Sequence, residues 1–269
     1  MEYTNLFKQC SDKVSKVGII GATRGYGYTL LAQIPKVKQM ELRLISSRHA
    51  DECMEVLTGL GYKEENIAVC ETAEQVKNAS KDKVLIVKDY HLVLESDITA
   101  LVECTGNTAV SAEVSAEALK RGINVYMVSK ETDSVCGPML NRIASQNGTV
   151  YSLVNGDQPR NLLDLYSWGK VLGLEIIAAG KASEYDFVWN PDTGEFTYME
   201  GNSEPNELIP EMKDFWHFKG VETLKERERL LEKYMDVISA DLCEMNLLSN
   251  VIGLVPSVPR MHYPIAKTS

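Results

Sequence analysis

Residues 17–27 have the sequence VGIIGATRGYG, and the fold class follows from it. An apolar run ending at Ile20 leads into Gly21, and Gly25 and Gly27 stand before a helical pattern. A strand, a glycine-rich turn and a helix in this order are typical of a site for the pyrophosphate of a dinucleotide. Glycine permits a positive φ and a close backbone approach, and the helix N-terminus presents free N–H groups. The alternative is a glycine-rich turn that binds no ligand.

The glycine spacing is G-x-x-x-G-x-G rather than the common G-x-G-x-x-G. Thr23 stands where the second glycine usually lies, a variant that recurs among enzymes that bind NADP. The residues expected to contact the cofactor in this loop are Gly21, Ala22, Thr23, Arg24, Gly25, Tyr26 and Gly27.

The end of the next predicted strand, 41–46, indicates which dinucleotide is bound. Sites for NAD usually have an acid here that bonds the ribose 2′-hydroxyl. This chain has Ser47 and Arg48 instead, with no acid before Asp51. A hydroxyl and a guanidinium suit a 2′-phosphate, which an acid would repel, and Arg24 could add a second positive charge. We therefore expect NADP(H) in preference to NAD(H), unless Arg48 is simply a surface residue.

Around this loop the first half of the chain alternates between short apolar runs and helical patterns. Further strands are predicted at 67–69, 84–87, 98–103 and 124–128, and helices at 28–34, 51–60 and 109–121. Such alternation predicts βαβ units and a parallel sheet, whose ligands bind beyond the carboxyl ends of the strands. We therefore expect Thr105, Gly106 and Asn107 to line the nicotinamide side. Lys130 and Glu131 follow the next strand.

The second half has a different pattern, and we place a domain boundary near residue 150. Strands are predicted at 148–153 and 174–179, helices at 158–172, 213–235 and 236–253, and a long loop or hairpin at 189–211. The sequence thus predicts a dinucleotide-binding domain over 1–150 and a second, smaller domain over 151–269.

Composition excludes several function classes. The 269 residues carry 28 Lys+Arg against 38 Asp+Glu, a net charge of -10 that argues against a nucleic-acid partner. No apolar run approaches the roughly 20 residues that cross a bilayer, so no membrane partner is expected. The polar N-terminus is unlike a secretory signal, and the six cysteines are scattered without C-x-x-C. Reduced thiols of a cytoplasmic protein are the expected state.

Four stretches resemble the homoserine-dehydrogenase-like NAD(P)-dependent oxidoreductases, closest to the 1-deoxy-D-xylulose 5-phosphate reductoisomerase-like branch. They are DITALVECTGN (97–107), NVYMVSKETD (124–133), VYSLVNGDQP (150–159) and LEIIAAGK (174–181). The resemblance implies a Rossmann-type parallel sheet with helices on both faces, plus a smaller α/β domain for substrate and homodimer contacts. It implies hydride transfer to or from a small polar hydroxy or keto compound, with or without a phosphate group. In this branch the transfer is linked to rearrangement of the carbon skeleton.

Three departures leave the substrate open. The glycine loop has one residue more than the branch has, and residues 235–244 lack the expected Gly-Thr-Lys run. The chain also ends soon after HYPIA, where relatives often continue into another domain.

Hydride transfer needs a proton donor or acceptor near the reacting oxygen. Lys181 follows a predicted strand and a glycine, and we expect it to fill this role; otherwise it is a surface lysine. Lys130 competes with it, because homoserine dehydrogenases have a lysine after this strand. Glu131, Asp133 and Asp157 could orient a substrate hydroxyl or hold a divalent cation such as magnesium, or they are solvated acids.

Several alternatives remain. Tyr151, Gln158, Glu244 and His262 are further candidates for the pocket lining, with ordinary packing or loop positions as the other interpretation. The chain could be homoserine dehydrogenase itself, although the second domain lacks expected pieces. It could also be a non-catalytic dinucleotide-binding sensor or scaffold.

Overall fold

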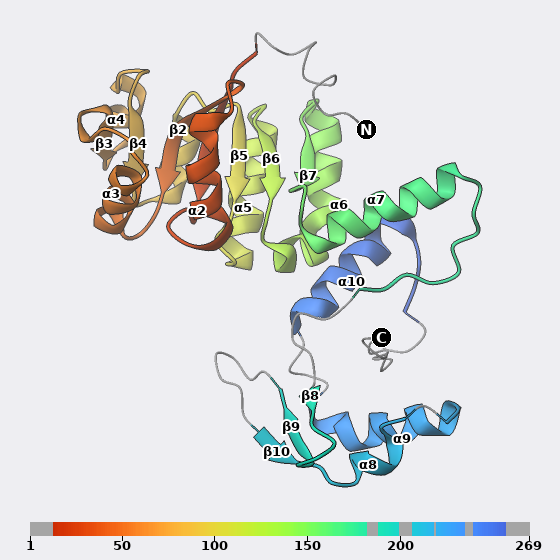
Figure 1. The fold of residues 1–269 in the computed structure, drawn as a ribbon. Helices are drawn as coiled ribbons and strands as arrows, with labels where there is room; N and C mark the ends of the chain where they lie inside the picture. Colours follow the sequence, from red (N-terminus) through yellow and green to blue (C-terminus); the bar gives the residue numbers. More distant parts are fainter. Residues whose placement is uncertain (1–12, 182–187, 199–205, 218, 235–238, 257–269) are drawn as a thin grey trace. The chain divides into compact units, whose positions relative to one another are not determined.

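The chain forms two compact units, residues 1–160 and 161–269, in the computed structural model (Figure 1). The structure describes residues 13–181, 188–198, 206–217, 219–234 and 239–256. None of the helices in this described part is long and apolar enough to cross a membrane.

The first unit is built on a seven-stranded sheet in which every neighbouring pair is parallel. The strands are β1 (Ser15–Ile20), β2 (Met40–Ser46), β3 (Ile67–Cys70), β4 (Val84–Val87), β5 (Ala100–Glu103), β6 (Asn124–Met127) and β7 (Tyr151–Leu153). Their order is β3-β4-β2-β1-β5-β6-β7. The chain builds one half of the sheet after β1 and the other half from β5 onward. The topological switch point therefore lies between β1 and β5.

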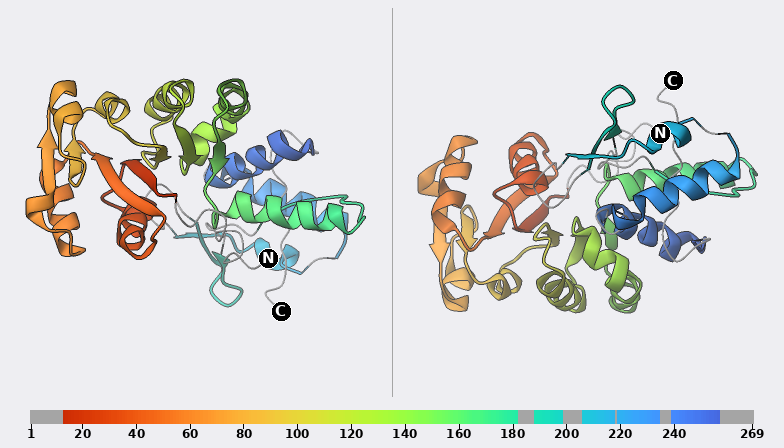
Figure 2. Two further views of the ribbon diagram at one scale, coloured as in Figure 1. Left: turned by 90° about the horizontal axis from the view of Figure 1, so that it is seen from above. Right: turned by 90° about the horizontal axis from the view of Figure 1, so that it is seen from below.

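Helices lie on both faces of this sheet (Figure 2). They are α2 (Gly25–Gln33), α3 (Ala50–Gly59), α4 (Ala73–Asn78), α5 (Thr108–Lys120) and α6 (Lys130–Asn147), with short 3-10 turns at Ile34–Lys36, Glu64–Asn66 and Tyr90–Glu95. Strand residues alternate between two apolar clusters. Ile19 packs with Leu31 of α2 on one face, whereas Ile20 packs with Val114 of α5 on the other. This arrangement confirms the predicted Rossmann-type α/β fold.

Two helices of the first unit were not expected from the sequence. Pro138 lies inside α6, and an internal proline normally argues against a helix because it lacks an N–H group. The first turn of α6 nonetheless carries Glu131 and Asp133, acids that suit the positive end of a helix. The short α4 is held by a capping box between Thr72 and Gln75.

The second unit combines helices with a small antiparallel sheet. Its elements are α7 (Gln158–Val171, which leads in from the first unit), β8 (Val188–Trp189), β9 (Glu195–Thr197), β10 (Asn206–Leu208), α8 (Met212–Phe215), α9 (Val221–Leu231), a 3-10 turn at Glu232–Tyr234, and α10 (Ser239–Ile252). The strands are ordered β10-β9-β8. Buried Trp189, Phe196, Tyr198, Met212 and Tyr234 form much of its core.

Two predictions for this unit were wrong. Residues 174–179 form no strand, because no described segment pairs with them, and Ile177 there is 87% exposed. The helix predicted over 213–235 is divided into α8 and α9. Gly220, with a φ of 131°, forms the N-cap of α9 and interrupts the helical path.

Candidate functional site

The strand ends of the first unit meet at one edge of the sheet. Ile20 is paired with both Ser46 and Glu103, Ser46 with Val87, and Glu103 with Met127. Each of these is the last residue of its strand, so the loops that follow leave the sheet together. This is the edge at which ligands of parallel sheets bind.

The glycine loop is packed tightly against the neighbouring strand end. Gly21 has a φ of 83°, and a Cβ atom there would lie 2.6 Å from the Cys104 carbonyl oxygen. Its N–H donates to the Ser46 carbonyl at 3.1 Å. A Cβ at Gly27 would lie 2.6 Å from the Gly21 carbonyl oxygen, so only glycine lets α2 approach this closely. The loop is thus fixed between β1, β2 and β5.

The N-terminus of α2 is open. Gly25 has a φ of 56°, and no atom lies within 4 Å of the Cβ position. Arg24, the N-cap, is extended, and no side chain in the described part of the chain caps this helix. Ala22 is buried and Thr23 half-buried, so they present mainly backbone. Free N–H groups at an open helix start fit the pyrophosphate of a dinucleotide.

Two arginines stand beside this opening. Arg24 is 87% exposed, and its Nε lies 3.3 Å from Oε1 of Glu52 in the first turn of α3. Arg48 is also exposed. Ser47 Oγ accepts the His49 N–H at 3.2 Å, which orders the turn after β2. Of the residues predicted to bind a 2′-phosphate, Arg24 thus contacts a carboxylate, that of Glu52, which the sequence pattern did not reveal.

The loop after β5 is ordered by its own hydrogen bonds. The Thr105 N–H and hydroxyl donate to Glu103 Oε1 at 2.8 and 2.5 Å. The Gly106 N–H donates to Ser129 Oγ at 2.9 Å, which joins this loop to the one after β6. Asn107 is the N-cap of α5 and accepts the Val110 N–H. All three predicted residues thus lie at the ligand edge.

Glu103, the last residue of β5, is a further candidate at this edge to which the sequence pattern gave no role. It is fully buried, and its Oε2 has no hydrogen-bond partner among the described residues. A buried carboxylate oxygen without a donor is uncommon, so Glu103 Oε2 is a candidate for contact with a ligand at this edge. The available signal was an acid closing the apolar strand Ala100–Glu103.

Asp157 lies near the glycine loop. Burial raises the pKa of the Tyr26 phenol, and the neighbouring Cys104 and Asp157 raise it further. Asp157 Oδ1 also accepts the Gln158 N–H at 2.9 Å, at the start of α7. The structure therefore brings together Tyr26 and Asp157, which are far apart in sequence.

The loop after β6 leads directly into α6. Lys130 is the first residue of this helix, and Glu131 lies half-buried beside it. Asp133 is buried and accepts a hydrogen bond from the Tyr151 hydroxyl. Burial raises the pKa of Asp133. Within the described residues, no three His, Cys, Asp or Glu side chains form a group that could hold a metal ion.

Lys181 and Glu244 belong to the second unit, whereas the residues predicted to contact the cofactor belong to the first. Lys181 Nζ forms an ion pair with Oε2 of Glu244 on α10. The two side chains are 8% and 1% exposed. The interpretation of Lys181 as a surface lysine is therefore wrong, whereas a role of Lys181 or Glu244 in a substrate pocket stays a prediction. His262 lies outside the described residues.

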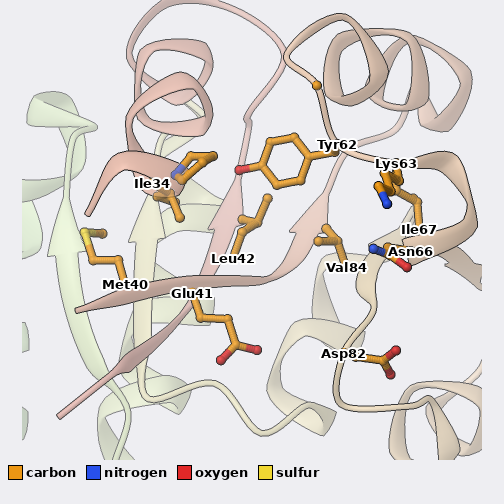
Figure 3. Close-up of a pocket in the computed structure, with 12 residues that line it drawn as sticks. Ile34, Met40, Glu41, Leu42, Tyr62, Lys63, Asn66, Ile67, Asp82 and Val84 are labelled. Atoms are coloured by element: carbon orange, nitrogen blue, oxygen red, sulfur yellow. The ribbon is translucent and has the colours of Figure 1, made fainter. Parts of the chain in front are cut away.

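A cavity of about 380 Å³ lies at the opposite edge of the sheet (Figure 3). Met40, Ile67 and Val84, the first residues of β2, β3 and β4, contribute to its lining, as do Leu42 and Tyr62. Because ligands of parallel sheets bind at the carboxyl ends of the strands, this cavity is separate from the candidate cofactor site.

Comparison with known proteins gives weak likenesses only. No protein-family model matches the chain, and no curated protein matches it. Among solved structures, scyllo-inositol dehydrogenase from Lactobacillus casei with bound NAD(H) and scyllo-inositol is 18% identical, with a TM-score of 0.41. The WlbA dehydrogenase from Bordetella pertussis, in complex with NADH and UDP-GlcNAcA, is 15% identical with a TM-score of 0.42. Homoserine dehydrogenase from S. aureus is 16% identical with a TM-score of 0.37.

The matched regions are partial. They take in 59%, 60% and 52% of this chain, and 42%, 43% and 32% of those three chains respectively. The chain thus corresponds to less than half the length of each. Likenesses of this size assign no activity to this chain.

Proposed function

We propose that this chain is an NAD(P)-dependent oxidoreductase that prefers NADP(H), with the first unit as its dinucleotide-binding domain. The observation that carries the proposal is the glycine loop at the switch point of a parallel sheet, with the open N-terminus of α2 after it. Exposed Arg24 and Arg48 favour a 2′-phosphorylated ribose. Thr105, Gly106 and Asn107 would line the nicotinamide side.

The substrate would be a small polar hydroxy or keto compound, with or without a phosphate group. Bound nicotinamide would supply or accept the hydride. The Lys181 ammonium, stabilised by the Glu244 carboxylate, would donate a proton to the carbonyl oxygen in the reductive direction and receive it back in oxidation. Lys130 at the start of α6 is the competing proton donor. Rearrangement of the carbon skeleton stays an expectation from the sequence resemblance.

Acids of the first unit and the second unit as a whole would help to bind the substrate. Glu131 and Asp157 would orient a substrate hydroxyl or take part in holding a divalent cation. The second unit would bind substrate and form the contact of a homodimer, which sedimentation analysis would test. The free cysteines of the described part fit a reducing compartment such as the cytoplasm.

Substituting the lysines tests the catalytic assignment. Small hydroxy acids, keto acids and sugar phosphates are first screened by the change in NADPH absorbance. With any substrate found, Lys181→Arg should lower kcat at least about a hundredfold, because the bulkier group cannot place the proton correctly. NADPH binding should not change. Lys130→Arg is measured in parallel, and exposed Lys170→Arg on α7 is the matched control. Unchanged kcat for Lys181→Arg with a large loss for Lys130→Arg would transfer the role to Lys130.

A further inference from the structure

The ion pair between Arg24 and Glu52 joins the two segments that surround the proposed ribose site. Arg24 is the N-cap of α2 within the glycine loop, and Glu52 lies in the first turn of α3, just after the Ser47-Arg48 turn. The Nε–Oε1 distance is 3.3 Å, and the side chains are 87% and 33% exposed. The pair therefore spans the gap between the loop and the end of β2.

This gap is where a dinucleotide site distinguishes its two cofactors. The adenosine ribose of a bound dinucleotide lies near the end of the second strand, so the 2′-substituent meets residues of these segments. A 2′-phosphate is attracted by guanidinium groups and repelled by a carboxylate. A 2′-hydroxyl carries no charge and interacts weakly with both. The Glu52 carboxylate consequently repels the 2′-phosphate and also pairs with Arg24, the guanidinium that would attract the phosphate.

We propose that Glu52 is a specificity-determining residue that restrains the preference for a 2′-phosphorylated ribose. It engages Arg24 through Nε in the free protein, and the 2′-phosphate competes with this carboxylate for the guanidinium. The inference rests on the proposed function and defines the cofactor choice of the same site. The chain therefore binds NADPH less tightly than its two arginines alone would allow, and it still accepts NADH.

The exposure of the pair makes the displacement feasible. An exposed ion pair contributes little stability because water and salt screen it. A phosphate offers the guanidinium several oxygens and the possibility of two parallel hydrogen bonds. The 2′-phosphate therefore replaces Glu52 as the partner of Arg24, but it binds less tightly than it would if Glu52 carried no charge.

The test is a calorimetric titration of the full chain with 2′,5′-ADP and 5′-AMP, which differ only in the 2′-phosphate. Glu52→Gln should tighten 2′,5′-ADP binding about fivefold, the upper end of what an exposed ion pair contributes. Binding of 5′-AMP should stay within about twofold. Glu55→Gln, which removes the same charge from an exposed position of α3, is the matched control and should change neither affinity by more than about twofold.

The Arg24→Gln background completes the test. Arg24→Gln should weaken 2′,5′-ADP binding about tenfold, and Glu52→Gln should then gain clearly less than in the wild-type background. Equal effects of Glu52→Gln and Glu55→Gln, or an undiminished gain in the Arg24→Gln background, would overturn the role of Glu52 while leaving the dinucleotide site intact. Binding of neither nucleotide to the wild-type chain would overturn the proposed function and this inference together.

Discussion

The two units of this chain are stabilised in different ways. The first has a seven-stranded parallel sheet between two aliphatic clusters, and its polar groups gather at the strand ends. The second has a three-stranded antiparallel sheet on an aromatic core, and it buries an ion pair between residues 63 positions apart. The first unit repeats a strand followed by a helix, whereas the second is held together by contacts between distant segments. Only the first therefore has an alternating sequence pattern from which the fold can be predicted.

The aromatic core of the second unit is compact. The rings of Trp189 and Trp216 are 5.0 Å apart, those of Phe196 and Tyr234 are 4.8 Å apart, and those of Tyr198 and Tyr234 are 4.5 Å apart. A few large side chains therefore carry most of the packing in this region. Truncating one should have a large effect that is confined to this unit.

Phe196→Ala should have the largest effect, and only on the second unit. Phe196 is 1% exposed, and truncating such a residue costs about 3–5 kcal/mol. We expect the second unit to unfold at lower temperature in calorimetry, while NADPH titration of the first unit is unchanged. Leu208→Ala, at a 71% exposed position of β10, is the control and should change neither measurement. Loss of NADPH binding in Phe196→Ala would show that the cofactor site depends on both units.

Lys181→Met should have the next largest effect, because it removes the ammonium group that forms an ion pair with the buried Glu244 carboxylate. Breaking a buried pair in this way costs about 3–5 kcal/mol. Chemical denaturation followed by tryptophan fluorescence measures the loss. The double variant Lys181→Met/Glu244→Leu should recover most of it, since neither charge then remains. A double variant no more stable than Lys181→Met would contradict the account.

Gly25→Val tests the first unit at its open helix start. A β-branched residue at a φ of 56° is strained, which should cost about 1–3 kcal/mol of stability. Its side chain would also occupy the space proposed for the pyrophosphate, so NADPH affinity should fall more than about tenfold. Gly59→Ala on α3, where no atom lies within 4 Å of the Cβ position, is the control. NADPH affinity equal to the wild type would place the pyrophosphate elsewhere.

Asp133→Asn should have the smallest effect, which is a change in how the free energy of unfolding depends on pH. Burial raises the pKa of Asp133 above its ordinary 3.8, and the hydrogen bond from Tyr151 offsets part of this. The folded chain then holds this proton more tightly than the unfolded chain does. Its contribution to stability is fully present below pH 3.8 and is lost as the pH rises through the raised pKa.

The difference between wild type and Asp133→Asn isolates this group from other acids. Each unit of pKa shift corresponds to about 1.4 kcal/mol, so the free energy of unfolding of the wild type should fall relative to the variant over this range. Exposed Asp51→Asn is the control and should track the wild type. If the free energies of unfolding of the wild type and Asp133→Asn changed in parallel with pH, the raised pKa of Asp133 would be contradicted.

The contrast between the units also explains what the sequence could predict. Strands such as β4 and β5 are short apolar runs between polar turns, so their type and approximate bounds follow from the pattern. The α6 helix was not predicted, and it includes Pro138 at an exposed position, where the missing N–H group does not end the helix. Residues 174–179 have strand-like composition, but a strand needs a neighbouring segment, and composition alone does not supply one.

In the candidate site, too, some features follow from the sequence pattern and others do not. The glycine loop and the Thr105–Asn107 turn were predictable because each directly follows an apolar strand. The partners of their side chains were not, since Arg24–Glu52 and Lys181–Glu244 arise from the way helices are placed by the fold. Burial of Glu103 likewise depends on the loops that close over the strand end.

The proposed function requires that the first unit bind a dinucleotide and prefer one with a 2′-phosphate. A fluorescence titration of the full chain with NADPH and NADH, side by side under identical salt, measures this preference. We predict saturable binding of both, with NADPH tighter by several-fold to about tenfold, as two arginines opposed by one carboxylate allow. Tighter binding of NADH would contradict the 2′-phosphate assignment, and binding of neither would contradict the dinucleotide site itself.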